Sequence, residues 1–320
     1  MNWRIALAAI GAATLLAGQA SAQNYGIGTS GQGSATYSMG SAIAKTVTEK
    51  TKLPMRVQPY TGTTQVVPLV NSGEVDFILA NVIEGTTAFK GTGPFKDKPN
   101  PNLRVVAVLQ PFYSAYFVKK DAPIKSMHDL KGKKLATEYT GQAIIKLLSQ
   151  AVLATAGLTA ADIQPVPVPN IVRGADDFAE GKTDAFFFAL ASGKVSEVDA
   201  AVGGLRALSL DNTPEALAAM RKLVPQAYIG TTTPRKDNPG VLAQTNVMAY
   251  DYLLFAGAHV KDDVVYQVIK ALFPSKAQLV ASYSGFADFD PATMAKDLPI
   301  PYHPGAIKFL TEAGQWPPKK

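Results

Sequence analysis

Three short segments rich in glycine and hydroxyl side chains offer most of the binding chemistry in this sequence. The first, residues 26–34, contains the spacing G-x-G-x-x-G and leads into a predicted helix. Backbone N–H groups and hydroxyls at the amino end of a helix stabilise a negative charge, because the helix dipole is positive there. The segment therefore predicts an anion site rather than a plain strand-to-helix turn, with the candidate contacts Thr29, Ser30, Gln32, Gly33 and Ser34.

Two further segments repeat this arrangement. Residues 60–65 follow one predicted strand and open a helix, and residues 138–142 do the same later in the chain. Ligands of open α/β sheets bind beyond the carboxyl ends of the strands, so loops of this kind would face one shared cleft. The candidate contacts from these two loops are Tyr60, Thr61, Gly62, Thr63, Tyr139, Thr140, Gly141 and Gln142.

A helix terminus alone binds an anion too weakly to make a receptor. It stabilises the charge by about 0.3–2 kcal/mol, whereas micromolar affinity needs roughly 8 kcal/mol. Arg173 is the leading candidate for a supporting cation, because it stands at a predicted strand-to-helix junction and a guanidinium can bind a carboxylate bidentately. An exposed arginine in a first helical turn is the alternative, and Arg56 and Arg235 are weaker candidates.

The sequence offers no constellation for catalysis or metal binding. His128, His259 and His303 are far apart in the chain, cysteine is absent, and no G-x-S-x-G motif occurs. His303 precedes Pro304 and is expected to open a helix. The run of three phenylalanines ending at Phe188 predicts a buried strand whose last residue can line the cleft. We therefore expect no enzyme activity, metal or cofactor.

Residues 1–22 are typical of an export signal. Arg4 precedes an apolar stretch, and Ala20-Ser21-Ala22 forms a small-residue cleavage site, so we expect cleavage after Ala22 and a periplasmic protein. The net charge is +6, and the basic residues are dispersed rather than gathered with aromatic residues as in a nucleic-acid footprint. We expect a monomer that binds no nucleic acid.

The G-x-G-x-x-G spacing is also the fingerprint of a dinucleotide-binding loop, and Glu49 follows near the distance of the acidic residue in such sites. The loop is longer and richer in hydroxyls than that fingerprint, and it lies just after the export signal, where free nicotinamide cofactors are not expected. A cytoplasmic oxidoreductase is thus a minor alternative.

Short apolar strands alternate with amphipathic helices, which is the pattern of an α/β fold with mostly parallel strands. Two lobes are expected, because the chain without its signal is near the size at which a single core stops growing. Residues 114–119 and 247–255 are extended and apolar and are expected to cross between the lobes as hinge strands. The predicted division is 23–118 and 248–320 for lobe 1 and 119–247 for lobe 2. Strands are expected at 25–29, 55–60, 75–80, 103–109, 134–137, 163–168, 185–190 and 205–210, and helices at 35–50, 65–71, 142–156, 173–180, 262–272, 275–283 and from Pro304.

Motifs spread over nearly the whole chain carry a family resemblance. They are GIGTSGQGSATYSMGSAIAK, VNSGEVDFILAN, SMHDLKGKKLA, GKTDAFFFALA, VVYQVIKALF and PIPYHPGAIKFLTEAGQW. With them the chain resembles the TAXI-type solute-binding subunits of tripartite ATP-independent periplasmic (TRAP) transporters. The resemblance implies a type II-like periplasmic-binding-protein clamshell that holds glutamate or another dicarboxylate and delivers it to integral membrane TRAP subunits.

The same resemblance adds Asn81 to the contacts and places the others in the first glycine-rich loop, the loop from Tyr60, and residues 140–142. The chain departs from the family pattern at Ser38, at 64–66 and at 80–81, which lie in or beside the supposed contact loops. The ligand of the relatives therefore need not transfer. An exported sensor-coupling protein or an enzyme on the same clamshell fold is the alternative function.

Overall fold

A computed structural model of the chain describes residues 24–318. The expected signal peptide and the cleavage point after Ala22 lie outside these residues. Within 24–318, no helix is both long enough and apolar enough to cross a membrane.

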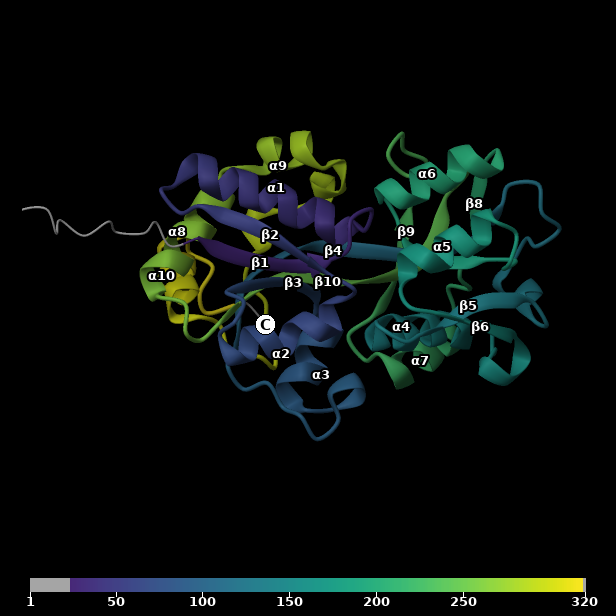
Figure 1. Cartoon of the computed structure of the whole chain (residues 1–320), viewed down its shortest axis with the longest axis horizontal. Coiled ribbons are helices and arrows are strands. Elements are labelled where there is room, and N and C mark those ends of the chain that lie inside the picture. The colour runs from purple at the N-terminus through teal and green to yellow at the C-terminus, as the bar shows by residue number, and fades with distance from the viewer. Residues whose placement is uncertain (1–23, 319–320) are drawn as a thin grey trace, which may run out of the picture.

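The molecule consists of two lobes joined by two long strands, β4 (Leu103–Lys119) and β10 (Thr245–Gly257) (Figure 1). These strands are antiparallel neighbours, and both run from one lobe into the other. They belong to one eight-stranded sheet with the core order β2-β1-β3-β10-β4-β7. The two-lobed α/β clamshell with two crossing strands that the sequence predicted is thereby confirmed.

The first lobe is built on parallel strands, of which the first begins at Tyr25. β1 pairs in parallel with β2 on one side and with β3 on the other, and β10 joins antiparallel to β3. Helices cover both faces of this sheet, with α1 and α9 on one face and α2 and α3 on the other (Figure 1). The elements are β1 (Tyr25–Ser30), α1 (Ala35–Lys50), β2 (Met55–Tyr60), α2 (Thr63–Ser72), β3 (Phe77–Asn81), α3 (Val82–Lys90), α8 (Asp262–Leu272), α9 (Lys276–Ser282) and α10 (Pro304–Glu312).

The second lobe is assembled around the far ends of the crossing strands. β7 and β8 pair with the last residues of β4, and β9 pairs with the first residues of β10. The parallel pair β5 and β6 is joined to the rest of this lobe by a bridge between Leu135 of β5 and Ala185, the residue before β7. The elements are β5 (Lys134–Tyr139), α4 (Ala143–Ala154), β6 (Gln164–Val168), α5 (Ile171–Ala179), β7 (Phe186–Ala189), α6 (Gly193–Val202), β8 (Leu205–Ala207), α7 (Pro214–Leu223) and β9 (Tyr228–Thr232).

The prediction that residues 103–109 and 114–119 are separate strands is wrong, because β4 continues through Pro111 without a break. Proline lacks a backbone N–H and is normally confined to sheet edges. Here β7 pairs with β4 only from Ser114 onward, so that β4 has β10 as its one strand neighbour at Pro111. The crossing strands are consequently longer than the sequence indicated.

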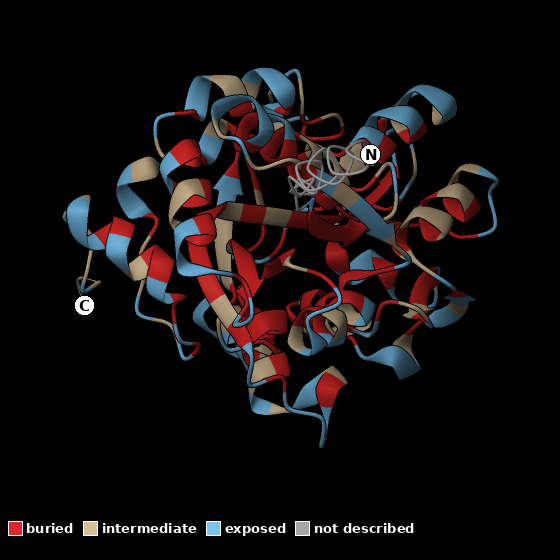
Figure 2. Cartoon of the chain, turned by 60° about the vertical axis from the view of Figure 1, so that its left-hand side comes forward, coloured by how far each residue is buried: buried red, intermediate tan, exposed pale blue. Residues whose placement is uncertain are grey.

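The core fills the space between the sheets and helices of both lobes, as the buried residues of Figure 2 show. β1, β3 and β7 are buried along their whole length, which explains why these strands are continuous apolar or small-residue runs. The sequence interpretation missed α3, α6, α7 and β9. In α3, Gly85 and neighbouring threonines have low helix propensity, and the helix is held by packing of Gly85 against Phe255.

Candidate functional site

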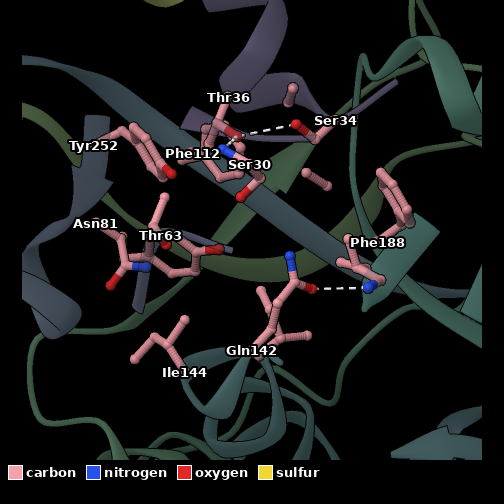
Figure 3. Close-up of a pocket in the computed structure, with 15 residues that line it drawn as sticks. Ser30, Ser34, Thr36, Thr63, Asn81, Phe112, Gln142, Ile144, Phe188 and Tyr252 are labelled. Carbon is pink, nitrogen blue, oxygen red and sulfur yellow. Dashed lines mark hydrogen bonds between the residues drawn. The ribbon is translucent and has the colours of Figure 1, made fainter. Parts of the chain in front are cut away.

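A cavity of about 50 Å³ lies between the two lobes, in front of the crossing strands. Figure 3 shows that loops and strands of both lobes contribute its walls. The lining residues are Ser30, Ser34, Ala35, Thr36, Thr63, Asn81, Phe112, Gln142, Ile144, Ile145, Ile171, Phe188, Ala189, Tyr250 and Tyr252.

The amino end of α1 forms one polar wall of this cavity. Ser34 caps the helix, since its Oγ accepts a hydrogen bond from the Tyr37 N–H at 3.2 Å and donates to the Gly31 carbonyl at 2.7 Å. The Thr36 hydroxyl lies 3.0 Å from Ser34 Oγ and accepts from the Ser30 N–H. These side chains therefore fix the loop after β1, while Ser30 Oγ points into the cavity without a partner among residues 24–318 (Figure 3).

A second polar wall comes from the loops that open α2 and α3. Asn81 follows β3 and caps α3, because its Oδ1 accepts from the Glu84 N–H at 2.8 Å. Its Nδ2 group has no hydrogen-bond partner within 24–318 and is available to a ligand. Thr63 lines the cavity too, but its hydroxyl donates to Glu84 Oε2 at 2.6 Å and so offers a ligand only lone pairs.

Glu84 is a fully buried carboxyl directly behind this wall. Its second oxygen accepts from the Thr64 hydroxyl at 2.8 Å. Burial, the largest cause, raises the pKa of Glu84 to about 7, although the hydrogen bonds from Thr63 and Thr64 favour the charged form. A negatively charged ligand on this side of the cavity therefore lies near a carboxyl group that is neutral below about pH 7.

The remaining wall is largely aromatic. Phe112 of β4 lies against Tyr252 of β10, with ring centroids 4.3 Å apart, and Tyr250 is nearby at 5.8 Å from Phe112. Burial raises the pKa of both tyrosines, so that they stay neutral. The sequence analysis named the crossing strands but missed these aromatic side chains. The i, i+2 spacing of Tyr250 and Tyr252, which places both on one face of a strand, was the signal that could have found them.

The lobes touch directly at the mouth of the cavity. Gln142 Nε2 of the second lobe donates to the Thr61 carbonyl of the first lobe at 2.8 Å, while Gln142 Oε1 accepts from the Ile171 N–H at 2.7 Å. The Lys194 N–H likewise donates to the Gly33 carbonyl at 3.2 Å. The structure is therefore a closed clamshell, and the amide of Gln142 is used to hold the lobes together.

The structure gathers the three predicted loops at this one cleft. Of the predicted contacts, Ser30, Ser34, Thr63, Asn81, Gln142 and Phe188 line the cavity, and Gln32, Thr61 and Arg173 lie with Ser30 around a second hollow at its edge. Gly33, Gly62 and Gly141 make the contact between the lobes. Thr29, Tyr60, Tyr139 and Thr140 do not line either hollow; Thr29 and Tyr139 are buried beneath the loops, and Thr140 is exposed.

Arg173 is occupied by partners within its own lobe. α5 begins at Ile171 rather than near Arg173, because the Asn170 side chain accepts from the Arg173 N–H and caps the helix two residues earlier. The guanidinium then lies on the helix surface, 2.5 Å from Asp177 Oδ1 and 3.4 Å from Glu180 Oε2. Its role as the ligand's cation stays a prediction that this geometry does not favour. Arg56 is exposed on β2, and Arg235 pairs with Asp237 elsewhere.

The cavity is lined by neutral groups throughout. No lysine, arginine or histidine is among its lining residues within 24–318. His303 instead opens α10, as predicted, because its Nδ1 accepts from the Gly305 N–H. No cluster of three or more metal-ligating side chains occurs in the described part of the chain. Any charge in the cavity must therefore be stabilised by hydrogen bonds and helix ends.

Ser30→Ala tests the polar wall directly. The substitution removes a hydroxyl that bonds nothing else in residues 24–318, so we expect ligand affinity to fall about tenfold, or about 1.4 kcal/mol, with unchanged stability. Ser38→Ala is the control, because Ser38 lies one turn further along α1 and outside the cavity. Calorimetric titration checks both; equal affinity of Ser30→Ala and Ser38→Ala would place the ligand elsewhere.

Two lobes, two crossing strands and a cavity enclosed between them define the fold of the periplasmic solute-binding proteins. A structure described as a periplasmic transporter shares this fold at 17% identity and a TM-score of 0.58, over 82% of this chain and 87% of that one. PhnD1 from Prochlorococcus marinus, in complex with methylphosphonate, matches at 11% identity and a TM-score of 0.56, over 86% and 93%. The alkanesulfonate-binding protein SsuA from Xanthomonas axonopodis pv. citri, bound to MOPS, matches at 17% and 0.52, over 84% and 81%.

Residues 27–314 match the profile of the NMT1-like family, so the chain belongs to this family. The three structures share the fold at low sequence identity, and their ligands are not transferred to this chain by that likeness.

Proposed function

We propose that this protein is a solute-binding receptor that captures a small organic anion between its lobes and delivers it to a membrane transporter. The observation that carries the proposal is the enclosed cavity at the crossing strands, bridged at its mouth by the hydrogen bond from Gln142 to Thr61. Hinge closure around a ligand is the usual motion of such clamshells. We propose no turnover of the ligand.

The finer parts of this proposal rest on the sequence. The TAXI-like motifs favour TRAP-type membrane subunits as the partner, and residues 1–22 favour export to the periplasm with cleavage after Ala22. We further propose that closure turns about β4 and β10, between a lobe of residues 23–118 and 248–320 and a lobe of residues 119–247, and that the receptor acts as a monomer.

Calorimetric titration combined with small-angle scattering tests the receptor function. The protein is first stripped of bound solute by unfolding and refolding, and then titrated with organic anions. We expect micromolar binding of at least one anion, which corresponds to roughly 8 kcal/mol, together with a decrease in the radius of gyration. Chemical conversion of the bound anion, or binding without compaction, would contradict the proposal.

A further inference from the structure

The free hydrogen-bond donors of the cavity cluster at one end of it. The backbone N–H groups of Ala35 and Thr36 at the start of α1 have no acceptor within residues 24–318. Ser30 Oγ, Asn81 Nδ2 and the Tyr252 hydroxyl likewise have no partner within 24–318, in residues that are 8%, 4% and 4% exposed. Figure 3 shows these side chains beside the same space. Three nearly buried, unpartnered donors and a helix end together form a place for one anionic group.

This donor cluster can balance one negative charge but not two. The nearby cations are already neutralised by carboxylates of their own lobe, because Arg173 pairs with Asp177 and Lys194 pairs with Asp176 and Glu197. Glu84 stands directly behind Thr63 and is ionised above its pKa of about 7, so at pH 8 a second negative charge on that side would lie close to a like charge. Like charges at short range disfavour each other strongly where water is excluded.

The opposite end of the cavity is apolar. Ile144 and Ile145 of α4, Ile171 of α5 and Phe188 of β7 form it, all from the second lobe. Gln142, the polar side chain among them, has its Oε1 and one of its two Nε2 hydrogens bonded to the protein. A second carboxylate at this end would lose its hydration and gain at most the remaining Nε2 hydrogen as a donor, which is unfavourable.

We infer that the ligand is a monocarboxylate with an aromatic or branched aliphatic body, and not a dicarboxylate. Its carboxylate is held by the Ala35 and Thr36 N–H groups, Ser30 and Asn81, and its body packs on the isoleucines and Phe188. This inference rests on the proposed receptor function, and it replaces the dicarboxylate that the family resemblance implied.

Two ligand panels test the inference by calorimetric titration at pH 8. The first contains phenylacetate, benzoate and 3-methylbutanoate, and the second contains succinate, glutarate, 2-oxoglutarate and glutamate. We expect the best ligand of the first panel to bind at least tenfold more tightly than the best of the second. The reverse order, with compaction on binding, overturns this inference alone. Failure of every compound in both panels to bind counts against the receptor function as well.

Two variants and one control test the roles of the apolar wall and of Glu84 behind Thr63 separately. Ile145→Thr should weaken the best monocarboxylate at least threefold, because Ile145 lines the cavity, whereas Leu147→Thr, a half-buried site on the same helix outside the cavity, should leave it unchanged. Glu84→Gln should raise the affinity for glutarate at least threefold relative to wild type. Equal effects of the two threonine variants, or no gain for glutarate, would contradict the assigned walls.

Discussion

Gly62→Ala is expected to lower ligand affinity at least tenfold without loss of stability. A Cβ at this position would overlap Gln142 Cγ and lie 3.0 Å from the Gly141 carbonyl oxygen, both across the gap between the lobes. The backbone of Gly141 cannot yield as a flexible side chain would, so the lobes must stay further apart. Gly62 itself has extended backbone angles that alanine also adopts, and the substitution therefore strains only the closed form.

The matched control is Gly193→Ala at the first position of α6, where an added Cβ meets nothing within 4 Å. Calorimetric titration gives the affinities, and scattering with saturating ligand reports whether the variant closes. A Gly62→Ala protein that binds like wild type and compacts fully would show that the contact at the mouth of the cavity is not required for closure.

The second large effect concerns Glu84 and pH. Its pKa rises from 4.5 in the unfolded chain to about 7 in the folded protein, so the folded state binds the proton more strongly. Stability from this group is fully present below pH 4.5 and is lost as the pH rises through 7. Each unit of pKa difference between the folded and unfolded states is worth about 1.4 kcal/mol, so the total loss of stability is about 3 kcal/mol. Urea unfolding at pH values from 5 to 8.5 should show this loss.

Glu84→Gln isolates that contribution, because glutamine cannot ionise. Burial lowers the pKa of His303, so that residue supports stability above pH 6.5 and loses it on the acid side, opposite to Glu84. His303 is present in both proteins, so its contribution cancels when the unfolding free energy of Glu84→Gln is subtracted from that of the wild type. We expect the variant to become more stable relative to the wild type as the pH rises. A difference that stays constant from pH 5 to 8.5 would mean that Glu84 remains in one protonation state.

Local patterns in the sequence predicted much of this architecture. The ends of α1 at Ala35 and Lys50 and of α8 at Asp262 and Leu272 agree with their apolar spacing, because helix period and capping act over a few residues. The helix at Pro214 was missed although Thr213 and Pro214 are ordinary start signals. The positions of the three glycine-rich loops were also predicted, because glycine and hydroxyl residues between a strand and a helix are a local turn signal.

The sequence predicted less well which side chains line the cavity. Arg173 has the same sequence surroundings whether it faces a ligand or pairs with Asp177, and only the cap at Asn170 decides which side of α5 it occupies. Phe112 and Tyr252 are far apart in the chain and stack only because β4 and β10 are neighbours. Their place in the cavity is therefore a property of strand pairing.

The sequence by itself thus determined an alternating α/β chain, its two lobes and the loops that border a cleft, because periodicity, capping and turn chemistry are short-range properties. The tertiary structure alone decided that the cleft is lined by neutral donors and aromatic rings, that Glu84 is buried behind Thr63, and that Gly62 faces Gly141. These features depend on which distant residues come into contact, and burial and charge in a cavity are set by the sum of those contacts.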